Sequence, residues 1–174
     1  MSAGPPGTEG IDRIDGITTG RRVHVVAGTD GAHVATSGRS YPARTLVEGR
    51  AAEGVEGEAL VLDEPLSFWG GLDPEDGRII DAHHPQHGAV VTGRVLVMPS
   101  GRGSSSASSV IAEALRLGTA PSAIVLATTD PIVVVGVLVA TLLYEVDCPV
   151  VTLGREAAGA DRDGAAWTRG DSNP

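Results

Sequence analysis

One stretch decides the organisation of this chain: Pro99-Ser100-Gly101-Arg102-Gly103-Ser104-Ser105-Ser106-Ala107-Ser108-Ser109. An apolar run over residues 95–98 precedes it, and an apolar stripe at helical spacing follows over residues 110–117 until Gly118. This order predicts a strand, a turn of small residues and the amino-terminus of a helix. Backbone N–H groups would then converge on the turn, while its serines supply helix caps or a free hydroxyl. We therefore look for a function here first.

A second strand–helix unit and a last strand are expected downstream. Residues 123–127 read as a strand, and Asp130-Pro131 is a favourable helix start, with Asp as N-cap and Pro in the first position. The β-branched residues of 132–143 favour a strand by propensity, but the length and the Thr-Asp-Pro entry favour a buried helix. With a final strand over 148–153, the second half is predicted to be a βαβαβ unit with parallel strands.

The first half has shorter strand-like runs, separated by glycines and turns. They cover residues 45–51, 58–62, 78–81 and 90–92. Close spacing of short strands predicts a compact, partly barrel-like sheet, so the fold class is α/β: this sheet followed by the βαβαβ unit.

The expected domain spans residues 44–154, between two less ordered ends. Residues 1–43 are predicted to be a partly disordered extension, in which 23–26 and 33–36 form either a hairpin or a loose arm against a partner. Residues 155–174 are rich in Ala, Gly, Asp and Arg and are predicted to be a flexible tail.

Composition argues against several classes of partner and compartment. A formal charge of −9 and 3% aromatic residues disfavour binding to nucleic acid or an anionic membrane. Cys148 is the single cysteine and is expected to be a small buried residue, since one thiol builds neither a disulfide framework nor a metal cluster. The first residues lack the apolar core of a signal peptide, and the apolar run 131–143 is too short to span a bilayer, so we expect a cytoplasmic protein.

The serine turn allows three roles: an anion cradle, the source of a nucleophile or base, or a connector. It lacks the Lys of a phosphate-loop NTPase and the Gly-x-Ser-x-Gly pattern of a nucleophile elbow. A serine that acts as a base needs helix N–H groups and a cation such as Arg102 to stabilise its alkoxide.

Two other groups of residues suggest a functional role, one rich in histidine and one containing an aromatic pair. His83, His84 and His87 suggest a metal site, but Pro85 spoils their helical spacing and no second group of ligands exists. A solvent-exposed or interface loop is the better interpretation, with substrate contact as a further alternative. The segment 68–71, Phe-Trp-Gly-Gly, favours core packing, with a tight turn approached by another surface as the alternative.

Three separated segments carry a family resemblance: Leu66-Ser67-Phe68-Trp69-Gly70-Gly71-Leu72-Asp73-Pro74, Gly93-Arg94-Val95-Leu96-Val97-Met98-Pro99-Ser100-Gly101-Arg102-Gly103-Ser104-Ser105-Ser106 and Gly118-Thr119-Ala120-Pro121-Ser122-Ala123-Ile124. In this order they resemble the swivel domain of the aconitase X family, over residues 44–153. The resemblance implies a swivelling β/β/α domain, similar to the carboxyl-terminal domain of aconitase.

The family's proteins are hydro-lyases, so the resemblance implies a small subunit of a heterodimer that is inert without a large partner. The implied iron–sulfur cluster belongs on that large subunit, because Cys148 alone cannot ligate one. The implied substrate is cis-3-hydroxy-L-proline or a related hydroxy acid, with mevalonate 5-phosphate, dehydrated to an anhydromevalonate phosphate, as the alternative. The amino-acid sequences of residues 83–85 and 99–102 resemble the hydroxyproline branch of the family more than the phosphomevalonate branch.

The resemblance also implies roles within the turn. Ser104 is the expected proton acceptor, removing a proton next to a carboxylate while cluster iron on the partner assists loss of hydroxide. The expected substrate-binding residues are Arg102, Gly103, Ser105 and Ser106, and no residue is expected to ligate a metal. Ser106 departs from aconitase, which has a substrate-binding arginine after its serine pair. Outside this class, a non-catalytic anion-binding module or an assembly protein remains open.

Overall fold

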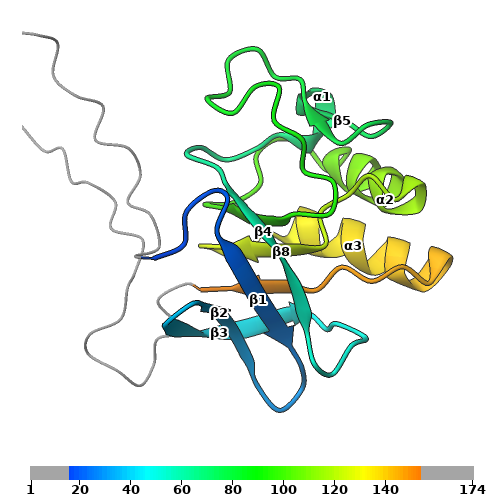
Figure 1. Cartoon of the computed structure of the whole chain (residues 1–174). Coiled ribbons are helices and arrows are strands. Elements are labelled where there is room, and N and C mark those ends of the chain that lie inside the picture. The colour runs from blue at the N-terminus through cyan, green and yellow to red at the C-terminus, as the bar shows by residue number, and fades with distance from the viewer. Residues whose placement is uncertain (1–15, 154–174) are drawn as a thin grey trace, which may run out of the picture.

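The computed structural model describes residues 16–153, which build a closed seven-stranded barrel with helices packed on one side (Figure 1). The elements are, in chain order, β1 (Arg22–Ala27), β2 (Ala32–Thr36), β3 (Arg39–Val47), β4 (Val55–Val61), α1 (Phe68–Gly71), β5 (Leu72–Asp73), β6 (Arg78–Ile79), β7 (Val95–Met98), α2 (Ala107–Leu117), β8 (Ala123–Leu126), α3 (Pro131–Tyr144) and β9 (Val150–Thr152). The barrel has the strand order β1-β2-β3-β9-β8-β7-β4, and β5 pairs with β6 in a small separate sheet.

The central strands are apolar throughout because both of their faces are buried. In β7, Val95 and Val97 point into the barrel, whereas Leu96 and Met98 pack in the second core, which includes residues of α2 and α3. The residues of β8 divide between the same two cores. This alternation follows from the two-residue period of a strand. Because both faces of β7 and β8 are packed, the ends of these two strands are fixed relative to the helices.

The predicted βαβαβ unit is confirmed, and it is part of the barrel rather than an addition to it. Strands β4, β7, β8 and β9 are neighbours with parallel pairing, and β9 pairs antiparallel with β3 through a register shift between Thr45 and Val47. The predicted strands at 78–81 and 90–92 are reduced to β6 and an isolated bridge between Arg78 and Val90.

The chain before residue 44 differs most from the prediction. Val23 to Ala27 pair antiparallel with residues 32–36, which confirms the hairpin alternative, and β1 also pairs with β4. The predicted boundary at residue 44 lies inside β3, because the barrel closes only when these N-terminal strands are included. The predicted disorder of the first residues and the predicted flexible tail lie outside the described residues.

Helix α2 ends as predicted but begins differently. Gly118 adopts a φ of 75° and its N–H donates to the carbonyls of Ala114 and Leu115, which is a left-handed cap. Ser106 occupies the N-cap position without a capping side-chain hydrogen bond, so the predicted serine cap is not formed. Leu117, which was expected on the apolar stripe, is 42% exposed.

Helix α3 begins at the predicted signal. The Oδ1 atom of Asp130 accepts hydrogen bonds from the N–H groups of Ile132 (2.8 Å) and Val133 (3.3 Å). One face is buried against the core, and Gly136 allows close contact with α2, since a Cβ there would lie 2.8 Å from the carbonyl oxygen of Ser108. The opposite face is apolar and exposed, so the expected buried helix is buried on one side only. Within residues 16–153, no helix has the length and apolar character needed to cross a membrane.

Cys148 is buried as predicted, with its Sγ donating to the carbonyl oxygen of Pro121 (3.4 Å). Burial, together with the nearby Asp147 carboxylate, raises the pKa of this thiol to about 12.

We expect Cys148 to resist an aromatic disulfide reagent at pH 8 in the folded protein and to react fully in denaturant, measured by released thiolate absorbance. Because the folded pKa is raised, stability should fall as the pH rises from about 9 toward 12. Rapid labelling of the folded chain would contradict this prediction.

Candidate active site at the serine turn

The serine turn, residues 99–106, begins where β7 ends and lies against the loop that follows β4. The N–H of Arg102 donates to the carbonyl oxygen of Leu66 at 3.0 Å, and Leu66 forms a parallel bridge with Gly101. The two loops therefore share one edge of the barrel, although 35 positions separate Leu66 from Gly101 in sequence (101 − 66).

Two glycines of the turn are required by close neighbours. A Cβ on Gly101 would lie 2.5 Å from Oδ2 of Asp130, the residue that caps α3. Gly103 has a φ of +107°, and a Cβ there would lie 2.8 Å from the Ser67 hydroxyl oxygen. These contacts hold the turn between the start of α3 and the 65–71 loop, and both positions disfavour any other residue.

The turn before α2 offers donors to a ligand, whereas the amino-terminus of α3 does not. Asp130 places its own carboxylate on the first N–H groups of α3. At α2 the first turn has no acidic residue, and the hydroxyls of Ser104, Ser105 and Ser106 have no hydrogen-bond partner within residues 16–153. All three serines are exposed. The first N–H groups of α2 already donate to the carbonyl oxygens of these serines, so the donors left for an anion are the three hydroxyls and the N–H groups of residues 103–106.

Arg102 is held at the edge of the turn by Asp81. Its Nη2 atom lies 3.0 Å from Oδ2 of Asp81, and the other carboxylate oxygen of Asp81 accepts a 2.9 Å hydrogen bond from the N–H of His83. That hydrogen bond and then the Arg102 guanidinium lower the pKa of Asp81 below its ordinary value of 3.8. Asp81 is therefore ionised at neutral pH and orients the one cation of the turn.

This pair predicts a pH-dependent effect of Asp81→Asn. A carboxyl group with a lowered folded-state pKa stabilises the fold above its unfolded pKa and loses that contribution as the pH falls through the folded value. We expect the variant to be slightly less stable than the unaltered chain at pH 7, with a difference that shrinks as the pH falls below 3.8, measured by denaturant midpoints from pH 7 to pH 2. A difference that stays constant over this range would contradict the prediction.

The histidine loop is only partly exposed. The His83 side chain is 98% exposed, but His84 is buried, with Nε2 3.3 Å from the carbonyl oxygen of Glu64 and Nδ1 accepting from the N–H of Gln86 (3.1 Å). His84 is thus a packing residue, which corrects the expectation of an exposed loop. Within the described residues, no group of three or more His, Cys, Asp or Glu side chains is placed to hold a metal ion.

The aromatic pair of the 65–71 loop divides between core and surface. Phe68 is buried in the core, as the favoured interpretation predicted, whereas Trp69 is 58% exposed. Gly70 adopts a φ of 72°, and the Ser67 hydroxyl donates to the carbonyl oxygen of Trp69 (2.9 Å). The tight turn, which was the alternative interpretation, is therefore also present, and the Trp69 side chain lies at the surface.

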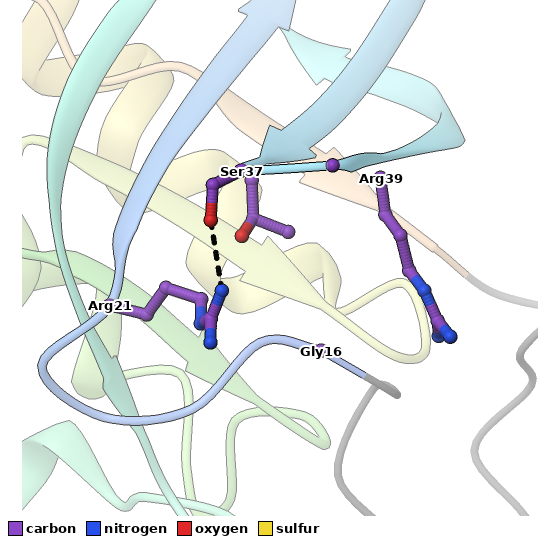
Figure 2. A pocket seen from close by; sticks show the side chains of 6 residues that line it. Gly16, Arg21, Ser37 and Arg39 are labelled. Atoms are coloured by element: carbon purple, nitrogen blue, oxygen red, sulfur yellow. Dashed lines mark hydrogen bonds between the residues drawn. The ribbon is translucent and has the colours of Figure 1, made fainter.

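A separate pocket lies where the first described residues meet the β2–β3 turn (Figure 2). It has a volume of about 440 Å³ and shares no residue with the serine turn. Arg21 donates to the hydroxyl of Ser37 at 2.9 Å across it. Its lining consists of Gly16, Arg21, Thr36, Ser37, Gly38 and Arg39.

The residues of this chain do not fit an iron–sulfur cluster. Such clusters are held by several thiolates, and Cys148 is the single cysteine, buried and with a raised pKa. The chemistry available at the turn is that of hydroxyls, N–H donors and one guanidinium. This set can bind a carboxylate or phosphate and can place a hydroxyl against it.

The structure brings the five predicted site residues, Arg102 to Ser106, together on one turn. Sequence reasoning did not identify Asp81 and Ser67 as neighbours of that turn. Asp130 was predicted as a helix cap, but not as a contact of Gly101. No local pattern marks these contacts, because each joins separate segments of the chain.

A closed barrel with helices on one side and a serine turn between β7 and α2 is the architecture that the described residues define. The aconitase X swivel domain model matches residues 40–166, so the chain belongs to the aconitase X swivel domain family.

Relatives and a solved structure agree with this assignment. The chain is 45% identical over 111 residues to cis-3-hydroxy-L-proline dehydratase of Pseudomonas aeruginosa, a match to 64% of this chain and 18% of that protein. It is 50% identical over 84 residues to the phosphomevalonate dehydratase small subunit of Methanopyrus kandleri, covering 48% of this chain and 62% of that one. The crystal structure of Thermococcus kodakaraensis aconitase X (holo-form) superposes with a TM-score of 0.55 at 36% identity, covering 63% and 76%. The chain thus spans less than a fifth of the length of the hydroxyproline dehydratases that it matches.

Proposed function

We propose that this chain is the swivel subunit of an aconitase X-type hydro-lyase that dehydrates a small hydroxy acid. The observation that carries the proposal is the turn before α2, where exposed serine hydroxyls and the N–H groups of residues 103–106 stand beside Arg102. An acceptor for a proton next to a carboxylate needs donors of this kind to stabilise the charge that develops.

In this proposal Ser104 Oγ takes the proton from the carbon next to the substrate carboxylate. The electron pair of that C–H bond forms the C=C bond, and hydroxide leaves from the adjacent carbon. Arg102 and the N–H groups of Gly103, Ser105 and Ser106 hold the carboxylate and lower the cost of the Ser104 alkoxide. Asp81 keeps Arg102 in place and moderates its charge.

The serines are solvent-exposed, and a hydroxyl in bulk water is a poor base. We therefore assign the reaction to a complex in which a large subunit covers the turn and carries the iron–sulfur cluster that this chain cannot hold. The names of the small-subunit relatives support such a partner. A cytoplasmic location remains a prediction.

For the substrate we favour cis-3-hydroxy-L-proline, because the match to the hydroxyproline dehydratase extends over 111 residues. Mevalonate 5-phosphate is the second candidate, supported by 50% identity to a phosphomevalonate dehydratase small subunit over 84 residues.

The test is co-production of this chain with an aconitase X-type large subunit, followed by incubation with each hydroxy acid and detection of the unsaturated product by NMR. The expected result is turnover of cis-3-hydroxy-L-proline by the complex and by neither subunit alone. A complex that dehydrates neither compound would refute the hydro-lyase assignment. Tight phosphate binding by the isolated chain, with no turnover in the complex, would favour the anion-binding module.

A further inference from the structure

Helix α3 has a second apolar face that nothing within residues 16–153 covers. Its buried face consists of Val133, Gly136, Val137 and Ala140. The exposed face, which we call the α3 stripe, consists of Val135 (51% exposed), Leu138 (40%), Val139 (41%), Leu142 (80%) and Leu143 (66%).

The α3 stripe has the pattern of a packing surface rather than of scattered apolar residues. Its members follow the spacing i, i+3, i+4, i+7 and i+8, which places them along one side of a helix. The fourteen residues of α3 include no Asp, Glu, Lys or Arg. A helix that is apolar all round is normally buried on all sides, so the stripe indicates a missing neighbour.

The area of the stripe is too small for two copies of this chain to form a stable dimer by packing stripe against stripe alone. Five side chains exposed by 40–80% present apolar area on the order of 400 Å², within the range of large functional patches. A stable interface needs about 800 Å² from each partner, so the occupant must also cover the surface beside the stripe. The formal charge of −9 on each chain further opposes association of two copies.

The surface at the amino-terminal end of α3 is the serine turn. Asp130, the N-cap of α3, and the buried Val133 both lie against Gly101 of the turn, and Val135, the first residue of the stripe, follows Asp130 by about one and a half helical turns on the outer side of α3. An occupant that reaches over the amino-terminal end of α3 can therefore cover both the stripe and the turn. Within the proposed function, the component that must cover the turn is the large subunit.

We propose that the α3 stripe is the docking surface for the large, cluster-bearing subunit, an inference that rests on the proposed function. The occupant is expected to present a matching apolar surface to α3 and to bring its half of the active site over the serine turn. The lengths of the relatives agree with such an arrangement. The match to this chain covers only 18% of each hydroxyproline dehydratase, so most of each of those proteins lies outside the region that resembles this chain.

The test places charges at both ends of the stripe. Val135→Glu combined with Leu142→Glu should weaken binding to the large subunit at least 100-fold, measured by calorimetry or by surface plasmon resonance, because both side chains lose an apolar contact and bury a carboxylate. Both positions are more than half exposed, so the circular dichroism spectrum and melting temperature should stay those of the unaltered chain. Ser40→Glu, on an exposed position of β3, is the matched charge control and should bind normally.

Three results would overturn the inference. They are normal binding of the stripe variant, failure of the unaltered chain to bind the large subunit, or a dimer of this chain alone that the stripe variant dissociates. Turnover separates this inference from the proposed function. Stripe-dependent binding without dehydration refutes the function and supports the docking surface, whereas dehydration with stripe-independent binding does the reverse.

Discussion

Ser104→Ala is expected to lower the turnover number of the complex with the large subunit by about 10²–10⁴-fold, the usual contribution of a positioned general base. The hydroxyl is exposed and has no partner in the described residues, so its removal breaks no contact within this chain. Stability and affinity for the large subunit should therefore not change. Initial rates under saturating substrate, with a thermal melt of each variant, measure both expectations.

Ser109→Ala is the matched control, because Ser109 is also an exposed serine but lies within α2, five positions after Ser104. It should retain full activity. If Ser104→Ala retains full activity as well, Ser104 is not the proton acceptor and the role passes to another group. A loss that appears only in the Michaelis constant would assign Ser104 to binding rather than to proton transfer.

Gly77→Ala is expected to destabilise the fold by about 2–5 kcal/mol, combining left-handed strain with overpacking. Gly77 has a φ of +71°, and a Cβ there would clash with the Thr92 hydroxyl and with the backbone carbonyl of Thr119. That carbonyl belongs to the segment just after α2 and accepts a 2.7 Å hydrogen bond from Thr92, so it has little freedom to move. The change should appear as a large fall in the denaturant midpoint.

Gly93→Ala separates the two causes. Gly93 has nearly the same φ, +67°, but a Cβ there would meet nothing within 4 Å. This variant should lose only about 1–2 kcal/mol, the cost of the left-handed conformation. Equal losses at both positions would show that the clash at Gly77 is relieved by local movement.

The second half of the fold could be predicted because its signals are local. The strand at 95–98, the Gly118 cap and the Asp130-Pro131 start each depend on neighbours within a few residues, and all three are observed. The closed barrel could not be predicted in the same way. Its closure depends on β1 pairing with β4 and on β3 pairing with β9, between residues as far apart as Arg44 and Thr152.

The candidate site shows the same difference between features set by neighbouring residues and features set by long-range contacts. The cluster from Arg102 to Ser106 is contiguous, so its composition alone indicated a functional turn. Asp81 joins Arg102 across 21 positions, and His84 is buried by contacts with Glu64 in a loop whose composition is polar. Periodicity carries no information on such pairs, because tertiary packing determines them.

The closed barrel also limits how this domain can associate with other chains. Each of its seven strands is paired on both sides within the described residues, so none presents a free row of N–H and C=O groups to an added strand. Recognition by strand addition is therefore not available to the barrel, and side chains of the helices and loops must make the contacts instead. A closed barrel can therefore rotate or shift against another chain as a rigid unit, without breaking or forming backbone hydrogen bonds between chains.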